Sequence, residues 1–323
     1  MKLEISALLS TYNRAPLLYQ ALDALTRQTL PPELFEVIVV DDGSTDNTRE
    51  VVSSFEHALN VQYLFQEHKG LAAGKNLAIA QASAPVILFM DDDDVPDPDL
   101  LTQHLLSHRQ CNEHTAILGY TTLSAELLDD PLMHFVTEVQ HYLFSYPQLS
   151  HGQFYDYTHF WGGRSSCKTN LVREHGCFDE VFTFGCEDIE LGYRLSRVTP
   201  FRVLYNQRAV STMIRGIDVD AFMRRTYRQG VANALFYRKH PTREVLSWTQ
   251  LQDWAARWEN TKNRIKYLRR AACKVDRLAR IRRESGLGDD DDILLLLYQS
   301  YRDAFDASRL KGSADQLLLV HDH

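Results

Sequence analysis

The chain has 323 residues, of which 44% are hydrophobic and 24% are charged, and its formal net charge at pH 7 is −8. These proportions are ordinary for a folded globular protein and exclude a disordered chain. The acidic balance also argues against a general nucleic-acid binder, since phosphate backbones are bound by basic surfaces.

The cysteines and the N-terminus indicate a reducing, cytoplasmic setting. The cysteine count is odd (five), and no C-x-x-C pair occurs, so we expect reduced thiols and no zinc site. The first residues run directly into a strand-like segment without the layout of a signal peptide. The apolar runs are far shorter than the roughly 20 residues of a membrane span.

The N-terminal part alternates buried strands with helices. Near-continuous apolar strands joined by helices predict a doubly wound, mostly parallel α/β sheet of Rossmann-like type with helices on both faces. The strands are expected at 5–9, 36–40, 61–65 and 86–90, with helices from about residue 15, from Asp46 to about residue 57, and over 72–81.

Polar loops follow three of these strands, at 11–14, 41–46 and 91–94. In a doubly wound sheet, ligands bind in the crevice beyond the carboxyl ends of the strands. We therefore expect the three loops to meet at one edge of the sheet and to form a binding site there.

The third loop consists of four consecutive aspartates, Asp91 to Asp94. Four adjacent like charges repel each other, and a divalent cation held by carboxylates removes this repulsion and can clamp phosphate oxygens. The alternative interpretation is a solvated acidic turn that caps a helix beginning near Pro98.

The pattern loosens beyond these aspartates. We expect helices at 99–109 and 187–197, strands at 116–120 and 201–205, and an aromatic stretch at 132–160 that favours packing over binding. From about residue 247 a helical appendage follows, with a basic helix and a last helix at about 293–308.

Several motifs in series resemble family 2 glycosyltransferases of the GT-A fold. Later segments resemble the acceptor half of chondroitin-polymerase-like and galactosyltransferase-like members, and the resemblance covers about residues 5–205. The segments are STYNR at 10–14, VVDDGSTD at 39–46, GLAAGKN at 70–76, MDDDD at 90–94, WGG at 161–163, GCFDE at 176–180 and GCED at 185–188.

The resemblance implies an inverting, hexosyltransferase-type enzyme. It would move a sugar from a nucleotide diphosphate sugar, with UDP-sugar favoured, to a hydroxyl of a saccharide or lipid-linked acceptor in polysaccharide or glycoconjugate synthesis. It also implies a GT-A domain at 1–245, with a nucleotide-sugar half (1–94) and an acceptor half (95–245), followed by a helical region at 246–323.

By resemblance, Asp91 and Asp93 are the two acids of a D-x-D motif. Asp91 would face the ribose or the sugar, and Asp93 would ligate Mn²⁺ or Mg²⁺, which offsets the charge that develops on the leaving diphosphate. Asp92 is assigned to the nucleotide-sugar site, and either Asp92 or Asp94 is expected to brace the loop.

Five further residues are assigned to the nucleotide sugar by resemblance: Thr11, Asn13, Arg14, Asp42 and Lys75. Asp42 would accept a hydrogen bond from the base, and the alternative is that it caps the following helix. Lys75 stands where the family often has arginine, and it offers a point charge instead of a bidentate fork. The alternative for Lys75 is a solvated helix lysine.

On the acceptor side, Asp188 is the candidate base that takes the proton of the attacking hydroxyl. Its place at a helix start would keep it ionised, although plain helix capping is the alternative. Glu187 would orient an acceptor hydroxyl. Gly162 and Gly163 are assigned to the acceptor site with Trp161, which either stacks on a sugar or packs in the core.

One departure from the family pattern concerns the metal. Many relatives have a histidine after the strand at 201–205, whereas residues 206–213 contain none. Water and phosphate oxygens would then complete the coordination, or the ion would bind weakly. His240 is a remote second candidate.

The basic stretch that begins at Lys262 and ends at Arg283 has three interpretations. It is a solvated helix face, a peripheral contact with anionic lipid, or a partner of the acidic segment at 289–292 or of a second subunit.

Two other functions compete with glycosyl transfer. A sugar-1-phosphate nucleotidyltransferase needs a glycine-rich loop after the first strand, and 10–14 contains no glycine. A non-catalytic nucleotide-sugar-binding protein is favoured by the missing histidine and disfavoured by the retention of Asp91, Asp93, Glu187 and Asp188.

Overall fold

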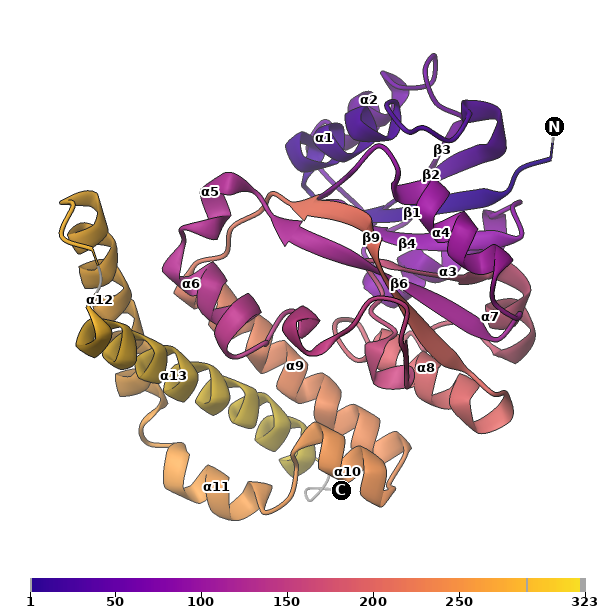
Figure 1. Ribbon diagram of the computed structural model, residues 1–323. Coiled ribbons are helices and arrows are strands. Elements are labelled where there is room, and N and C mark those ends of the chain that lie inside the picture. Colours follow the sequence, from indigo (N-terminus) through magenta and orange to yellow (C-terminus); the bar gives the residue numbers. More distant parts are fainter. Residues whose placement is uncertain (1, 289, 320–323) are drawn as a thin grey trace. The chain divides into compact units, whose positions relative to one another are not determined.

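The computed structural model describes residues 2–288 and 290–319, which form two compact units (Figure 1). The first unit comprises the chain up to Ser124 together with Gln148–Thr183 and Glu187–Arg215. The second comprises Ala125–Pro147, Phe184–Cys186 and the chain from Gly216 onward.

The described part of the first unit is built around a nine-stranded sheet with the order β3-β2-β1-β4-β8-β6-β9-β5, and β7 pairs with β9. The first four strands in this order are parallel, as the sequence predicts. Because β1, β2 and β4 are buried on both faces, their apolar runs are nearly continuous. These strands are β1 (Ile5–Thr11), β2 (Phe35–Asp41), β3 (Val61–Phe65) and β4 (Val86–Asp91).

Beyond β4 the sheet is mixed. β8 is antiparallel to both β4 and β6, whereas β9 is parallel to β6. β9 extends well past the predicted strand and pairs antiparallel with β5, which places Met213 beside Asp94. The strands are β5 (Asp94–Pro96), β6 (Thr115–Leu123), β7 (Phe154–Tyr155), β8 (Ser165–Lys168) and β9 (Arg202–Met213).

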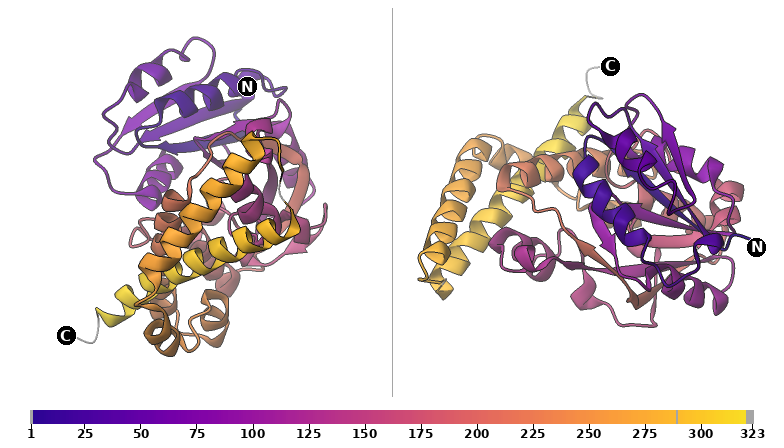
Figure 2. Two further views of the ribbon diagram at one scale, coloured as in Figure 1. Left: turned by 90° about the vertical axis from the view of Figure 1, so that its left-hand side faces the viewer. Right: turned by 90° about the horizontal axis from the view of Figure 1, so that it is seen from above.

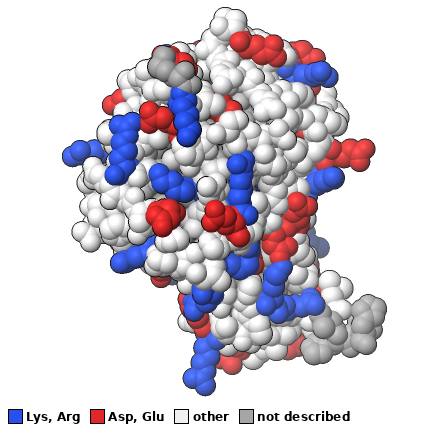
Figure 3. All heavy atoms as spheres, turned by 90° about the vertical axis from the view of Figure 1, so that its right-hand side faces the viewer, with Lys and Arg blue, Asp and Glu red and all other residues white. Residues whose placement is uncertain are grey.

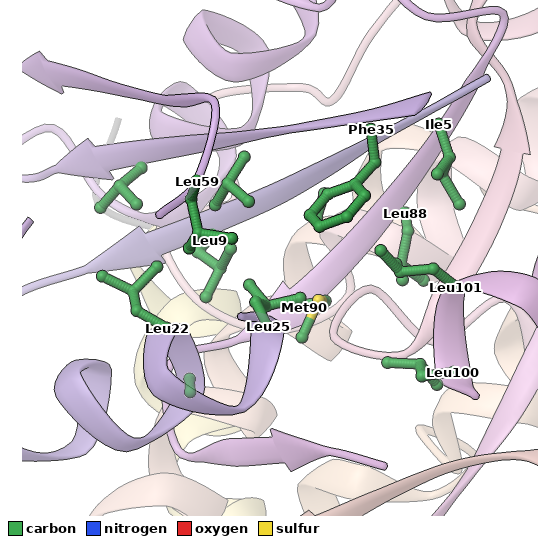
Figure 4. Close-up of a cluster of buried hydrophobic side chains, with 14 of the residues drawn as sticks. Ile5, Leu9, Leu22, Leu25, Phe35, Leu59, Leu88, Met90, Leu100 and Leu101 are labelled. Atoms are coloured by element: carbon green, nitrogen blue, oxygen red, sulfur yellow. The ribbon is translucent and has the colours of Figure 1, made fainter. Parts of the chain in front are cut away.

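Helices cover both faces of the parallel strands. Alternate residues such as Leu9, Leu88 and Met90 pack with α1, α2 and α4 in one apolar cluster (Figure 4). On the other face α3 approaches so closely that a Cβ at Gly74 would lie 3.0 Å from Ser10 Oγ. These helices are α1 (Ala15–Leu25), α2 (Thr48–Ser53), α3 (Leu71–Gln81) and α4 (Leu100–Arg109), followed in this unit by α7 (Thr169–His175), α8 (Glu187–Val198) and the short turns Pro32–Leu34 and Tyr157–His159. A further turn, Tyr146–Gln148, spans the boundary in the chain between the second unit and the first.

The second unit is helical around an aromatic core. Phe135, Phe222, Tyr301 and Phe305 are fully buried, so the start of the aromatic stretch is packing. α12 and α13 lie side by side, and the Tyr301 hydroxyl donates to Asp276 (Figure 2). The elements are α5 (Ala125–Leu128), α6 (Pro131–His134), a π-helical turn (Phe135–Val139), α9 (Val219–Lys239), α10 (Arg243–Thr249), α11 (Trp254–Thr261), α12 (Ile265–Glu284) and α13 (Asp291–Leu318).

The division into units differs from the boundary expected after residue 245. The sequence did not predict the helix α9. In the structure this helix packs on α13 through two glycines. A Cβ at Gly230 would lie 1.9 Å from Arg309 O, and one at Gly312 would lie 1.9 Å from Tyr227 O. This close crossing places α9 with the C-terminal helices.

The basic stretch forms most of α12, and several of its arginines have acidic partners. Arg269 pairs with Asp220 at 2.7 Å, Arg280 with Asp130 at 2.6 Å, and Arg282 with Asp290 at 3.3 Å. The pair of Arg282 with Asp290 favours the interpretation in which the basic stretch packs on the acidic segment at 289–292. Asp289 of this segment lies outside the described residues. Within the described residues, the search for a helix long and apolar enough to span a membrane found none.

Candidate active site

The carboxyl ends of β1, β2 and β4 meet at one edge of the sheet, as predicted. In the strand register, Thr11 is the partner of Asp41, and Ser10 is the partner of Asp91. The three polar loops therefore start side by side.

Asp92 is buried at this edge and braces the first loop. It accepts hydrogen bonds from Thr11 Oγ1 at 2.7 Å and from an Arg14 terminal nitrogen at 2.8 Å. Burial raises the pKa of Asp92 to about 6, although Arg14 acts against that shift. Thr11 and Arg14 thus hold the aspartate loop against β1.

The other three aspartates also have arginine partners. Arg164 donates to Asp91 at 2.9 Å and lies 3.3 Å from Asp94. Arg215 donates through Nε to Asp93 at 2.5 Å. Since Asp92, Asp93 and Asp94 are each at most 5% exposed, the run is not a solvated turn.

The side chains around Asp93 do not fit the predicted metal site. Arg215 occupies one oxygen of Asp93, and the residues of β9 beside the loop are Thr212 and Met213. Mn²⁺ and Mg²⁺ prefer carboxylate and other oxygen ligands, and a guanidinium beside the ligand repels a cation. No cluster of three or more His, Cys, Asp or Glu able to hold an ion occurs among the described residues.

Asp42 and Asn13 both hold loops together. Asp42 accepts from Gln66 Nε2 at 2.6 Å and from the backbone N–H groups of Lys69 and Gly70, and it lies 2.9 Å from His68 Nδ1. These partners fill the roughly four acceptor positions of a carboxylate. Base recognition by Asp42 stays a prediction, and it requires one of these partners to give way.

Asn13 adopts a left-handed backbone conformation with φ of 52°. Its side-chain oxygen accepts from Thr45 N at 2.8 Å, and its own N–H donates to Ser44 Oγ at 2.8 Å. Asn13 therefore fixes the loop that contains Asp42.

Lys75 is buried and pairs with Glu187 Oε1 at 2.9 Å, so it is not a solvated helix lysine. Burial alone would lower the pKa of Lys75, but Glu187, Asp188 and Asp91 raise it above its ordinary value. The cation thus stays charged. Glu187 Oε2 is buried without a hydrogen-bond partner among the residues that the structure describes.

Asp188 stands in the second position of α8 and is half-buried. Its Oδ2 accepts from Gly162 N at 2.7 Å, and its Oδ1 accepts from Ile189 N at 2.8 Å. Burial, followed by the charge of Glu187, raises the pKa of Asp188, while Lys75 lowers it in part.

The segment with Gly162 and Gly163 connects the two groups of acids. Gly162 N–H donates to Asp188, and Gly163 O accepts from Asp91 N at 3.2 Å. A Cβ on Gly163 would lie 2.1 Å from Asp91 Oδ2, and one on Gly162 would lie 2.5 Å from Lys75 Nζ. A larger residue at either position would have to displace the Asp91 carboxylate or the Lys75 ammonium group.

Trp161, next to these glycines, is half-buried, and its indole N–H donates to Thr158 O at 3.0 Å. Its ring centroid lies 5.9 Å from that of His159. Trp161 is therefore neither a fully buried core residue nor a freely exposed one.

The sequence reading missed Arg164 and Arg215. Arg164 follows directly on the WGG motif, and Arg215 stands two residues beyond the end of β9. Reading residues 202–213 as one long strand would have placed Arg215 at the sheet edge. No residue pattern in the chain reveals that either arginine pairs with an aspartate of the run.

A family model described as glycosyl transferase family 2 matches residues 6–175, which is more than half of the chain. The chain belongs to this family. The resemblance seen in its motifs is thereby confirmed.

Among curated relatives, validoxylamine A glucosyltransferase of Streptomyces hygroscopicus subsp. limoneus is 33% identical over 267 residues, covering 74% of this chain and 57% of the relative. Chondroitin synthase of Escherichia coli is 30% identical over 222 residues, covering 60% of this chain and 32% of the relative. The chain thus spans less than two thirds of the length of these relatives.

Solved structures of glycosyltransferases have the same GT-A fold as this chain. A mannosyltransferase from Pyrobaculum calidifontis, solved with GDP-Man and Mn²⁺, has a TM-score of 0.61 at 18% identity, covering 98% of this chain and 88% of that one. TarS of S. aureus, solved with UDP-GlcNAc, has a TM-score of 0.57 at 16% identity, covering 97% and 92%.

Proposed function

We propose that this family 2 glycosyltransferase is an inverting enzyme that transfers a sugar from a nucleoside diphosphate sugar to a hydroxyl of a saccharide or lipid-linked acceptor. The observation that carries the proposal is the junction at Gly162 and Gly163. In this segment the Gly162 N–H donates a hydrogen bond to Asp188, and the Gly163 carbonyl accepts one from the Asp91 N–H. An acid suited to the donor and a base suited to the acceptor are thereby held next to each other.

In the proposed reaction the acceptor oxygen forms a bond to the anomeric carbon while the bond from that carbon to the diphosphate oxygen breaks. Asp188 takes the proton of the acceptor hydroxyl as general base. Attack from the face opposite the leaving group inverts the anomeric configuration. The diphosphate leaves with the bonding electron pair, so its negative charge needs positive partners.

Glu187 is the proposed acceptor-orienting residue. Because Lys75 occupies only Oε1, the buried Oε2 is available to accept a hydrogen bond from an acceptor hydroxyl. The half-buried ring of Trp161 would supply an apolar surface for a sugar face.

On the donor side, Thr11, Arg14, Asp91 and Asp92 form the proposed nucleotide-sugar site, with Asp42 assigned to the base. UDP is our first choice, because a structural neighbour was solved with UDP-GlcNAc, although another was solved with GDP-Man. That second neighbour also holds Mn²⁺, which supports a divalent ion as one candidate for offsetting the diphosphate charge. The arginines of the site are the other candidate.

The test is a panel of UDP- and GDP-sugars incubated with simple saccharide acceptors, followed by NMR of the product. We expect nucleoside diphosphate release with one donor, and a product whose anomeric configuration is opposite to that of the donor. A product that retains the donor configuration would overturn the inverting assignment. Binding of a donor without turnover of any acceptor would favour a non-catalytic protein.

For a lipid-linked acceptor, we propose that α12 contacts an anionic membrane. Its Lys266, Arg270, Lys274 and Arg277 are exposed, and each basic residue near such a surface contributes about 1 kcal/mol. Pelleting with phosphatidylserine vesicles should recover the protein at low salt. Equal recovery with neutral vesicles, or none with either kind, would remove this contact.

A further inference from the structure

By resemblance to the family, a metal ion would supply the positive charge beside the diphosphate of the donor. In this chain, arginines of the site also supply positive charge. The four aspartates at 91–94 are paired with three guanidinium groups, those of Arg14, Arg164 and Arg215. These arginines therefore offset most of the repulsion among the four aspartates, which would otherwise require a divalent cation.

Arg215 has the properties of a phosphate ligand. Its Nε is tethered to the buried Asp93, while its side chain is 35% exposed. Its two terminal nitrogens have no hydrogen-bond partner among the described residues. A guanidinium presents a planar set of donors that matches phosphate oxygens, so this anchored group still has donors to offer.

Arg14 repeats this arrangement on the neighbouring carboxylate. One terminal nitrogen donates to Asp92 and lies 3.7 Å from Asp93, and the side chain is 38% exposed. Arg14 and Arg215 thus approach the same aspartate from β1 and β9, the two sides of the loop.

We propose that Arg215, together with Arg14, binds the diphosphate of the donor and that this chain binds nucleotide without a divalent metal. The inference rests on the proposed function, because it names the group that holds the leaving diphosphate. The side chains around Asp93 agree with it, since Thr212 and Met213 stand beside the loop where further metal ligands would be needed.

The experiment is calorimetry of UDP and GDP with the whole chain, in excess EDTA and in Mn²⁺. We expect the wild-type affinity for the bound nucleotide to agree within about twofold in the two conditions. Arg215→Ala should weaken binding in EDTA by about tenfold or more, because a charge-assisted hydrogen bond to phosphate is lost. Arg215→Lys, which keeps the charge and a partner for Asp93, should retain part of the affinity.

Arg208→Ala is the matched control, since Arg208 lies on the same strand β9, is exposed and has no ion pair among the described residues. Binding that is lost in EDTA and restored by Mn²⁺ would overturn this inference alone. Unchanged affinity in Arg215→Ala would also overturn it. Absence of heat with both nucleotides in both conditions would overturn the proposed function and this inference together.

Discussion

At the scale of single residues, the site depends on buried charges that compensate each other. Lys75 is 5% exposed and pairs with Glu187, which is 3% exposed, while Asp188 is held by two backbone N–H groups. Each of these groups therefore has a charged or hydrogen-bonding partner. The rate and the stability should therefore respond to pH and to charge removal in specific ways.

The pH dependence of transfer should reflect Asp188. A general base acts when deprotonated, so the rate falls as the pH falls through its pKa. Burial and the charge of Glu187 raise the pKa of Asp188, so the loss should begin above the value of about 4 that is ordinary for aspartate. A profile of kcat/KM against pH measures this. A rate that stays constant down to pH 4 would contradict the assignment.

Lys75→Met should destabilise the fold. The change leaves Glu187 buried without its cation, and breaking a buried pair typically costs about 3–5 kcal/mol. Urea unfolding measures the free energy, and Lys69→Met is the control because Lys69 is exposed. The double variant Lys75→Met/Glu187→Gln should regain much of the loss. Equal stability of the Lys75 and Lys69 variants would show that the pair contributes nothing.

At the scale of elements, the strands were predictable where one physical signal dominated. β1, β2 and β4 were placed within one or two residues because continuous apolar runs end sharply at polar loops. β9 was cut short, since half of it alternates with polar residues such as Asn206 and Ser211. Charge pairing across the sheet, as between Arg215 and Asp93, leaves no local signal.

The helix α9 shows a second limit. Its apolar face is interrupted by Gly230, whose low helix propensity weakens a helix prediction. In the structure that glycine is needed for contact with α13. The residue that most obscures the helix in the sequence is thus the one that fixes its packing.

Gly230→Ala should therefore destabilise the second unit, although alanine is the better helix former. The new Cβ would lie 1.9 Å from Arg309 O, and overpacking of this kind costs about 1–3 kcal/mol or more. Thermal unfolding should show the loss, whereas Arg224→Ala, an exposed change on the same helix, should leave stability nearly unaltered. A melting temperature at or above that of the wild type would contradict the close crossing.

At the scale of the whole molecule, charge has different roles on the surface and in the site. The face drawn in Figure 3 shows Lys and Arg interspersed with Asp and Glu, without a continuous basic area. The net charge of −8 is a sum over the whole chain and does not indicate which charged residues form the site. There the charges are local and paired, and the motifs located the acids and Arg14 but not Arg164 and Arg215.

The central claim is that Asp188 acts as the base of a glycosyl transfer. The most direct measurement compares Asp188→Asn with wild type in nucleotide-sugar binding by calorimetry and in turnover with the acceptor. We predict unchanged binding within about threefold and a turnover reduced by at least about 10²-fold, as expected for loss of a general base. Asp23→Asn, which changes an α1 side chain that is 42% exposed and pairs with Arg27, should match wild type in both. Near-normal turnover by Asp188→Asn would contradict the account.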